Sequence, residues 1–254
     1  MTNSKLPKLK HPIFEVTLPT SKVKLSCRPW LVQEDRILLG AKESNTVEDI
    51  ALAVQQTMRN CVLDVDFDIA SLCSLDMDYL FLKVRGATVG NIVKPTYECN
   101  NVVKDEETGE ERECKGDFEF VLDLTKIGPD KPLVKSFEEV PLTDEYNVKF
   151  RYPLFDALRN LKAEDNEFVE STKKIMAVVD YIVSSKDKDA EPISFDGESV
   201  ENVIEFLNGL TSSQFDVLNK FIEDLPVISL DATAKCPRCG YEHVGNFKNL
   251  ASFF

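Results

Sequence analysis

The sequence predicts an α+β fold, with antiparallel β-hairpins followed by a largely helical C-terminal half and a short cysteine-containing module. Apolar residues alternate with a period of two in several short segments before residue 152, and they recur at helical spacing after residue 153. The regular strand–helix–strand units of a parallel sheet are missing from this order. We therefore expect a mixed α/β region at 1–152, a helical region at 153–225 and the cysteine module with its tail at 226–254.

The first 90 residues predict one hairpin and then three helices. Apolar residues alternate over 14–18 and again over 23–27, with a turn-like Pro-Thr-Ser-Lys link between the two segments. Helices are expected over 31–42, after a capping box formed by Thr46 and Asp49, and over 76–84. For Trp30, the single tryptophan of the chain, core burial and an exposed binding anchor are alternatives.

A second hairpin is predicted over 91–124. The strand that ends in Cys99 and the alternating segment after Cys114 flank a long charged loop, so one cysteine stands on each side of it. Another strand is expected at 146–152. The rest of the predicted elements are helices at 154–162, 167–183, 199–209 and 212–224, with a polar linker at 184–196 and Pro226 after the last helix.

The distribution of charge argues against nucleic acid as a partner. The chain carries −14 overall, and its first 30 residues carry +5, which leaves −19 for the other 224. A body this acidic repels phosphate backbones. The lysines of the N-terminus precede no apolar stretch, and no run approaches the roughly 20 apolar residues of a membrane span, so we expect no membrane partner and a location in the cytoplasm.

The seven cysteines point to a metal rather than to disulfides, because an odd number without an export signal is a poor disulfide framework. Cys236-Pro237-Arg238-Cys239-Gly240 places two thiolates three positions apart, and the glycine permits the sharp turn of a metal-binding knuckle. A structural zinc ion takes four ligands. Cys99 and Cys114, at the mouth of the second hairpin, are the expected other pair.

The four residues Cys99, Cys114, Cys236 and Cys239 would form a split zinc ribbon that joins the C-terminal module to the hairpin. His243 in place of one cysteine remains an alternative, as do Cys61 and Cys73, and so do four separate reduced thiols. A redox pair is disfavoured, since such pairs begin a helix after a strand. Four thiolates leave no open position for a substrate, so the ion would have a folding role.

Catalytic motifs are lacking in the sequence, and we expect no enzyme and no small-molecule substrate. Neither His11 nor His243 has a nucleophile or an acid at a defensible spacing, and the glycines form no phosphate-binding loop. Paired acids such as Glu34-Asp35 fit a solvated surface in a chain with 44 acidic residues. The aromatic tail at 249–254 is expected to pack on the zinc module, with docking to a partner as the alternative.

Three segments together resemble the baseplate hub proteins of T-even-type contractile-tailed phages: SKVKLSCRPWLVQEDRILLGAKES, DMDYLFLKVRGATVG and CPRCG running to a terminal SFF. The N-terminal part of the match lies on Arg28, Pro29, Glu34, Leu38, Glu43 and Ser44. The resemblance implies a non-enzymatic late protein, either a hub subunit or a chaperone-like hub assembly factor. It also implies other hub proteins as partners, with the tape-measure protein as a further candidate, in the host cytoplasm during assembly or in the virion tail.

A rival function of another class is a zinc-ribbon transcription or nucleic-acid accessory factor, because ribbons are common in such proteins. It requires a basic or aromatic face at the knuckle, where only Lys235, Arg238 and Lys248 are available. The oligomeric state, the partner and the surface that contacts it do not follow from the sequence.

Overall fold

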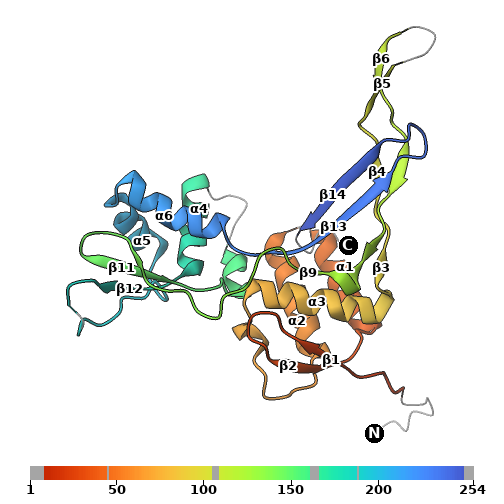
Figure 1. Cartoon of the computed structure of the whole chain (residues 1–254). Coiled ribbons are helices and arrows are strands. Elements are labelled where there is room, and N and C mark those ends of the chain that lie inside the picture. The colour runs from red at the N-terminus through yellow and green to blue at the C-terminus, as the bar shows by residue number, and fades with distance from the viewer. Residues whose placement is uncertain (1–8, 45, 105–108, 161–165, 188, 249–254) are drawn as a thin grey trace.

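The structure is a computed structural model that describes residues 9–44, 46–104, 109–160, 166–187 and 189–248 (Figure 1). It is an α+β fold with antiparallel strands, as predicted. None of the described helices combines the length and apolar character that crossing a membrane requires. The aromatic tail at 249–254 lies outside the described residues, so its predicted packing stays a prediction.

The N-terminal hairpin and the three helices after it are confirmed. Strands β1 (Phe14–Thr17) and β2 (Lys24–Cys27) pair with Val16 opposite Leu25, and both of these residues are buried. Thr46 caps the second helix by accepting the backbone amide of Asp49 at 3.1 Å. The helical elements of this part are α1 (Val32–Ser44), α2 (Val47–Cys61), the 3₁₀ turn η1 (Ile69–Ser71) and α3 (Ser74–Val89).

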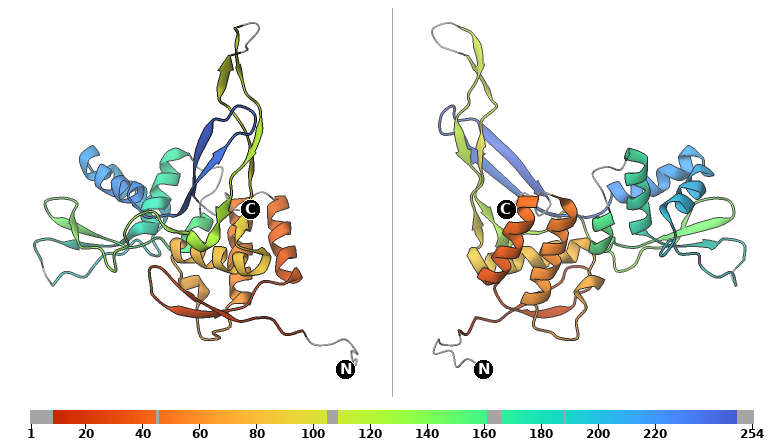
Figure 2. Two further views of the ribbon diagram at one scale, coloured as in Figure 1. Left: turned by 45° about the vertical axis from the view of Figure 1, so that its right-hand side comes forward. Right: turned by 180° about the vertical axis from the view of Figure 1, so that it is seen from behind.

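The second predicted hairpin is a long ribbon built from three short ladders. The pairs are β3 (Ile92–Val93) with β8 (Leu122–Asp123), β4 (Thr96–Glu98) with β7 (Asp117–Glu119), and β5 (Val102–Lys104) with β6 (Glu111–Glu113). Figures 1 and 2 show this ribbon rising away from the helices, with another hairpin, formed by residues 228–248, alongside its lower part.

The hairpin beside the ribbon consists of β13 (Ile228–Lys235) and β14 (Glu242–Lys248), and it was not predicted. Strand β13 also pairs with β9 (Gly128–Pro129), which follows the 3₁₀ turn η2 (Leu124–Lys126). Residues 228, 230, 232 and 234 are apolar and alternate with polar ones, so the sequence carried the signal of a strand here.

The remaining elements form a lobe to one side of the ribbon (Figure 1). They are β10 (Val140–Pro141), β11 (Tyr146–Phe150), α4 (Glu167–Val178), β12 (Val179–Ser184), α5 (Val200–Asn208) and α6 (Ser212–Glu223). One further element, the 3₁₀ helix η3 (Phe155–Asn160), also contacts the N-terminal part, where the Phe155 amide donates to the Leu72 carbonyl at 2.9 Å. The sheet order is β10-β11-β12.

Two predicted helices differ from the structure. The one expected over 167–183 ends at Val178, and residues 179–184 form β12 instead. Valine, tyrosine and isoleucine favour strands, and pairing with β11 across Val148 and Ile182 overrides the helical spacing. The helix expected over 154–162 is a 3₁₀ helix over Phe155–Asn160. The linker at 184–196 contains the buried side chain of Phe195.

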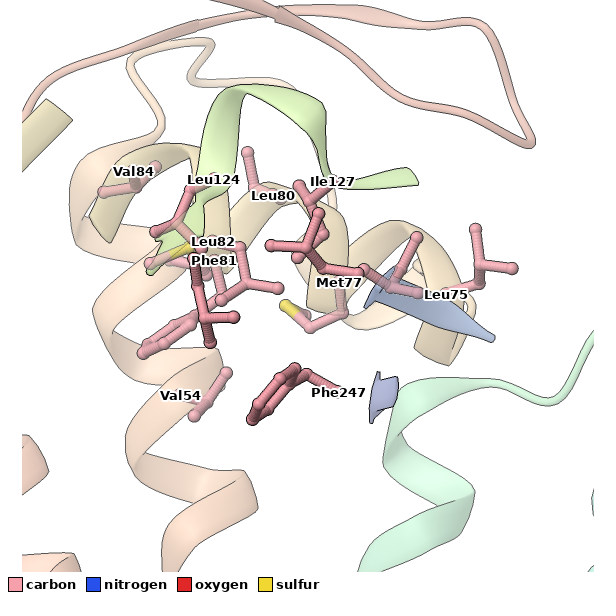
Figure 3. Packing of buried hydrophobic residues seen from close by; sticks show 14 of the residues in the cluster. Val54, Leu75, Met77, Leu80, Phe81, Leu82, Val84, Leu124, Ile127 and Phe247 are labelled. Carbon is pink, nitrogen blue, oxygen red and sulfur yellow. The ribbon is translucent and has the colours of Figure 1, made fainter. Parts of the chain in front are cut away.

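Buried apolar side chains gather in two clusters. The larger one joins β1 and β2, the first three helices and the ribbon with β13 and β14, and Figure 3 shows Phe247 of β14 lying with Val54 of α2 and Met77 of α3. The smaller one joins β11 and β12 with α4, α5 and α6. This places β11 with the helices that follow it. The division of the chain at residues 152 and 225 stays a prediction.

Two side chains of the N-terminal part, Trp30 and Glu34, are buried, and both bear on predictions from the sequence. Trp30 is buried, with its ring centroid 5.3 Å from that of Phe81, so the core reading is confirmed. Glu34 is fully buried, which corrects the expectation of a solvated Glu34-Asp35 pair. Its carboxylate accepts hydrogen bonds from Arg28 at 3.1 Å and from the Leu31 amide at 2.7 Å, and these partners compensate the charge.

Candidate metal centre

Cys99 and Cys114 lie where the ribbon changes from one ladder to the next. The β4–β7 ladder ends at Glu98 and Asp117, and the β5–β6 ladder begins at Val102 and Glu113. Backbone hydrogen bonds continue across the break: the Cys99 amide donates to the Gly116 carbonyl at 2.9 Å, and the Cys114 amide to the Asn101 carbonyl at 2.8 Å. The two cysteines are therefore held opposite each other.

Cys236 and Cys239 lie in the tight turn between β13 and β14. The turn is closed by two hydrogen bonds of 2.9 Å, from the Cys236 amide to the Tyr241 carbonyl and from the Gly240 amide to the Cys236 carbonyl. Gly240 has a φ of +74°, the left-handed conformation that favours glycine. This is the knuckle that the Cys-Pro-Arg-Cys-Gly motif predicts.

Two further residues join the knuckle to the ribbon. Arg238, between the two cysteines of the motif, donates from Nη1 to the Cys114 carbonyl at 2.9 Å. At Gly116, an added Cβ would lie 2.8 Å from Arg238 Cβ and 3.1 Å from Cys236 Sγ, so only glycine lets the strands approach this closely. The sequence analysis assigned no role to Gly116, since its partner lies more than 100 positions along the chain.

The sulfur atoms of all four cysteines lie within 4.8 Å of one another. Cys99 and Cys239 are 3.7 Å apart, and Cys114 and Cys236 are 3.8 Å apart. A tetrahedral zinc ion with Zn–S bonds of about 2.3 Å separates its sulfur ligands by about 3.8 Å. The arrangement therefore fits a zinc ion. Its ligands are soft thiolates, which suit zinc better than calcium or magnesium, since those two ions take oxygen ligands.

Burial differs among the four thiols and affects their protonation. Cys99, Cys114 and Cys236 are buried, while Cys239 is half-buried. Burial raises the pKa of Cys99 to about 12 and also raises the pKa of Cys114. A hydrogen bond from the Tyr241 amide lowers the pKa of Cys239 to about 6. A metal ion that binds here must displace protons from the buried thiols, so it competes with them directly.

The other candidates from the sequence lie elsewhere, apart from His243. Cys61 is buried beside Arg28, and Cys73 contacts the Thr20 hydroxyl at 3.3 Å. His243 Nε2 lies 3.2 Å from Cys99 Sγ, yet the group of mutually close ligand atoms among the described residues holds only the four sulfurs. The structure thus brings the four predicted cysteines together. Their role as metal ligands stays a prediction.

Two contacts at this centre were missed at the sequence level. Asn101 Nδ2 donates to Cys239 Sγ at 3.7 Å, and the His243 ring stacks on Phe118 with centroids 4.1 Å apart. An aromatic layer lies between the ribbon and β14, and it consists of Tyr97, Phe118, Phe120 and Phe247. The alternation at 118–124 predicted that Phe118 and Phe120 share a face, but it did not predict what covers that face.

Comparison with known proteins identifies the family. Residues 11–254 match the family described as T4 bacteriophage base plate protein. The match spans nearly the whole chain, so the protein belongs to this family, and the resemblance seen in the sequence is confirmed at that level. No curated protein and no solved structure matches the chain.

Proposed function

We propose that this member of the T4 base plate protein family is a non-enzymatic component or assembly factor of the baseplate hub, with one structural zinc ion on Cys99, Cys114, Cys236 and Cys239. The observation that carries the zinc assignment is the approach of four cysteine sulfurs to within 4.8 Å. The family supplies the association with a phage baseplate. The hub and the chaperone-like role are finer assignments that rest on the resemblance of the sequence.

The ion would act as a long-range cross-link. Cys99 and Cys239 are 140 positions apart, and Cys114 and Cys236 are 122 apart. Structural zinc sites contribute folding free energy directly, because the unfolded chain holds no preformed site. Four thiolates occupy all four coordination positions of a tetrahedral zinc ion, so no position is left for a reacting molecule. A stabilising role therefore agrees with a protein that works through contacts with other proteins.

The expected partners are other hub proteins, with the tape-measure protein as a further candidate, and the expected location is the host cytoplasm during assembly or the virion tail. Affinity purification of the full chain from infected cells, followed by mass spectrometry, tests this assignment. Recovery of hub or tape-measure proteins at stoichiometric levels is the expected result. Recovery of the chain without any tail protein, in an experiment where another baseplate protein does retrieve its neighbours, would contradict it.

The rival zinc-ribbon nucleic-acid factor needs a basic face at the knuckle. Arg238 is bonded to the Cys114 carbonyl, and Lys235 stands opposite Glu242 in the β13–β14 ladder. The Glu242 carboxylate offsets the charge of Lys235. Arg238 keeps its charge but is held against the ribbon, and one arginine alone does not make the basic face that phosphate binding requires. Titration of labelled DNA and RNA with the full chain at low salt tests the rival, and tight binding that weakens steeply with added salt would favour it.

A further inference from the structure

His243 lies beside the four sulfurs but not among them. Its Nε2 atom is 3.2 Å from Cys99 Sγ, while the ligand atoms that all lie within 4.8 Å of one another are sulfurs alone. A nitrogen ligand would have to lie close to every other ligand atom, because all of them would share one ion. The ring is held in this place by stacking on Phe118, with an interplanar angle of 9°. It therefore contacts one thiol instead of the centre of the cluster.

Asn101 makes the matching contact on the neighbouring thiol. Its Nδ2 atom donates to Cys239 Sγ at 3.7 Å, and the Cys99 and Cys239 sulfurs are themselves 3.7 Å apart. Both side chains thus contact the same half of the cluster. That half includes Cys239, the one thiol of the four that is not fully buried. In the buried half, the Arg238 guanidinium donates to the Cys114 carbonyl and not to a sulfur.

We propose that His243 and Asn101 are positioning residues, which donate hydrogen bonds to the metal-bound thiolates of Cys99 and Cys239 and thereby slow loss of the ion from the more exposed half. This inference rests on the proposed zinc site. A metal-bound thiolate can only accept, so the proton of the His243 ring is on Nε2. Four thiolates and one divalent ion carry a net charge of −2, and the two donors draw part of that charge away from the sulfurs. The sulfurs are then less open to protons and to competing chelators.

The rate at which zinc leaves the full-length protein tests the proposal, with release measured in excess chromophoric chelator. His243→Phe keeps an aromatic ring against Phe118 but removes the N–H. Release should become about tenfold faster, because loss of an outer-shell partner costs about 10–100-fold in metal affinity. Asn101→Ala should act in the same direction. His243→Gln, which restores an N–H donor, should recover part of the loss. Val244→Thr is the matched control, since this neighbour in β14 is 79% exposed on the opposite face.

Cobalt substitution separates a donor from a ligand. The thiolate-to-cobalt charge-transfer band grows with the number of thiolates, so wild type and His243→Phe should both show the intensity of four. A band intensity typical of three thiolates in wild type would make the ring a ligand and overturn the proposal. So would a band whose intensity changes with His243→Phe. Equal zinc release from wild type, His243→Phe and Asn101→Ala would overturn it while leaving the zinc site in place. A wild-type chain that binds neither ion would overturn both.

Discussion

Glu34 shows how single residues of the N-terminal part fix its fold. The side chain is fully buried, and its carboxylate accepts from Arg28, Leu31, Gln33 and Asn60. Burial alone would raise the pKa of Glu34, but the hydrogen bonds, first of all that from Arg28, lower it below its usual value. Arg28 and Glu34 thus tie the end of β2 to the first turn of α1. Both belong to the part of the chain that matches the base plate family.

Arg28→Leu should lower the free energy of unfolding by about 3–5 kcal/mol, because the Glu34 charge would stay buried without its partner. Chemical denaturation at neutral pH measures this change. Lys174→Leu is a matched control that breaks the exposed pair of Lys174 with Glu170, for which about 0–1 kcal/mol is expected. Equal losses in the two variants would contradict a special role for the buried pair.

Glu34→Gln gives a prediction about pH. A carboxyl group whose pKa is lowered on folding stabilises the protein above its ordinary pKa of 4.5, and this contribution is lost as the pH falls through the lowered value. The stability difference between wild type and Glu34→Gln should therefore be largest near neutral pH and shrink on acidification below 4.5. Denaturation curves recorded at several pH values test it, and a difference that stays constant with pH would count against the charged form.

At the scale of elements, the four-cysteine cluster depends on how closely the knuckle approaches the ribbon. Gly116 lies where the two pack closely, since a Cβ there would lie 2.8 Å from Arg238 Cβ. Gly116→Ala should therefore push the two apart and cost about 1–3 kcal/mol of stability in the zinc-loaded protein. Gly128→Ala is the control, because nothing lies within 4 Å of a Cβ at that position. Thermal unfolding of both variants measures the difference, and similar melting temperatures would be the contrary result.

The elements that the sequence predicted correctly are those whose local signals agree with their final contacts. The β1–β2 hairpin has alternation and a turn, and α2 has both a cap and an apolar stripe. In β12, the apolar residues satisfy helical and strand spacing alike, and only pairing with β11 decides between them. Local pattern carries no information about such a distant partner, and the same holds for the packing of His243 on Phe118.

At the scale of the whole molecule, β14 links the cysteine cluster to the core. One end of the strand places His243 beside Cys99, and the other end places Phe247 against Phe120 and the helices (Figure 3). The smaller cluster lies in a stretch of chain that begins and ends at neighbouring strands, since Pro129 of β9 pairs with Ile228 of β13. Because Cys236 and Cys239 lie in the turn between β13 and β14, loss of a zinc cross-link there is expected to loosen these two strands first.

Cys236→Ser should leave three ligands, weaken zinc binding and make the amides of β13 and β14 exchange faster with solvent, with loss of assembly as a consequence. Hydrogen exchange followed by mass spectrometry locates the change along the chain. Cys73→Ser is the comparison, because that cysteine is also buried but lies outside the cluster. Unchanged protection of β13 and β14 in Cys236→Ser would show that the hairpin is held without the ion.

The most direct test of the central claim is the zinc content of the full-length protein, purified without added metal and measured by elemental analysis against protein concentration. The account predicts one zinc ion per wild-type chain, and a marked loss in each of the four single serine variants at Cys99, Cys114, Cys236 and Cys239. A folded wild-type chain without zinc, or serine variants that keep a full equivalent, would contradict it.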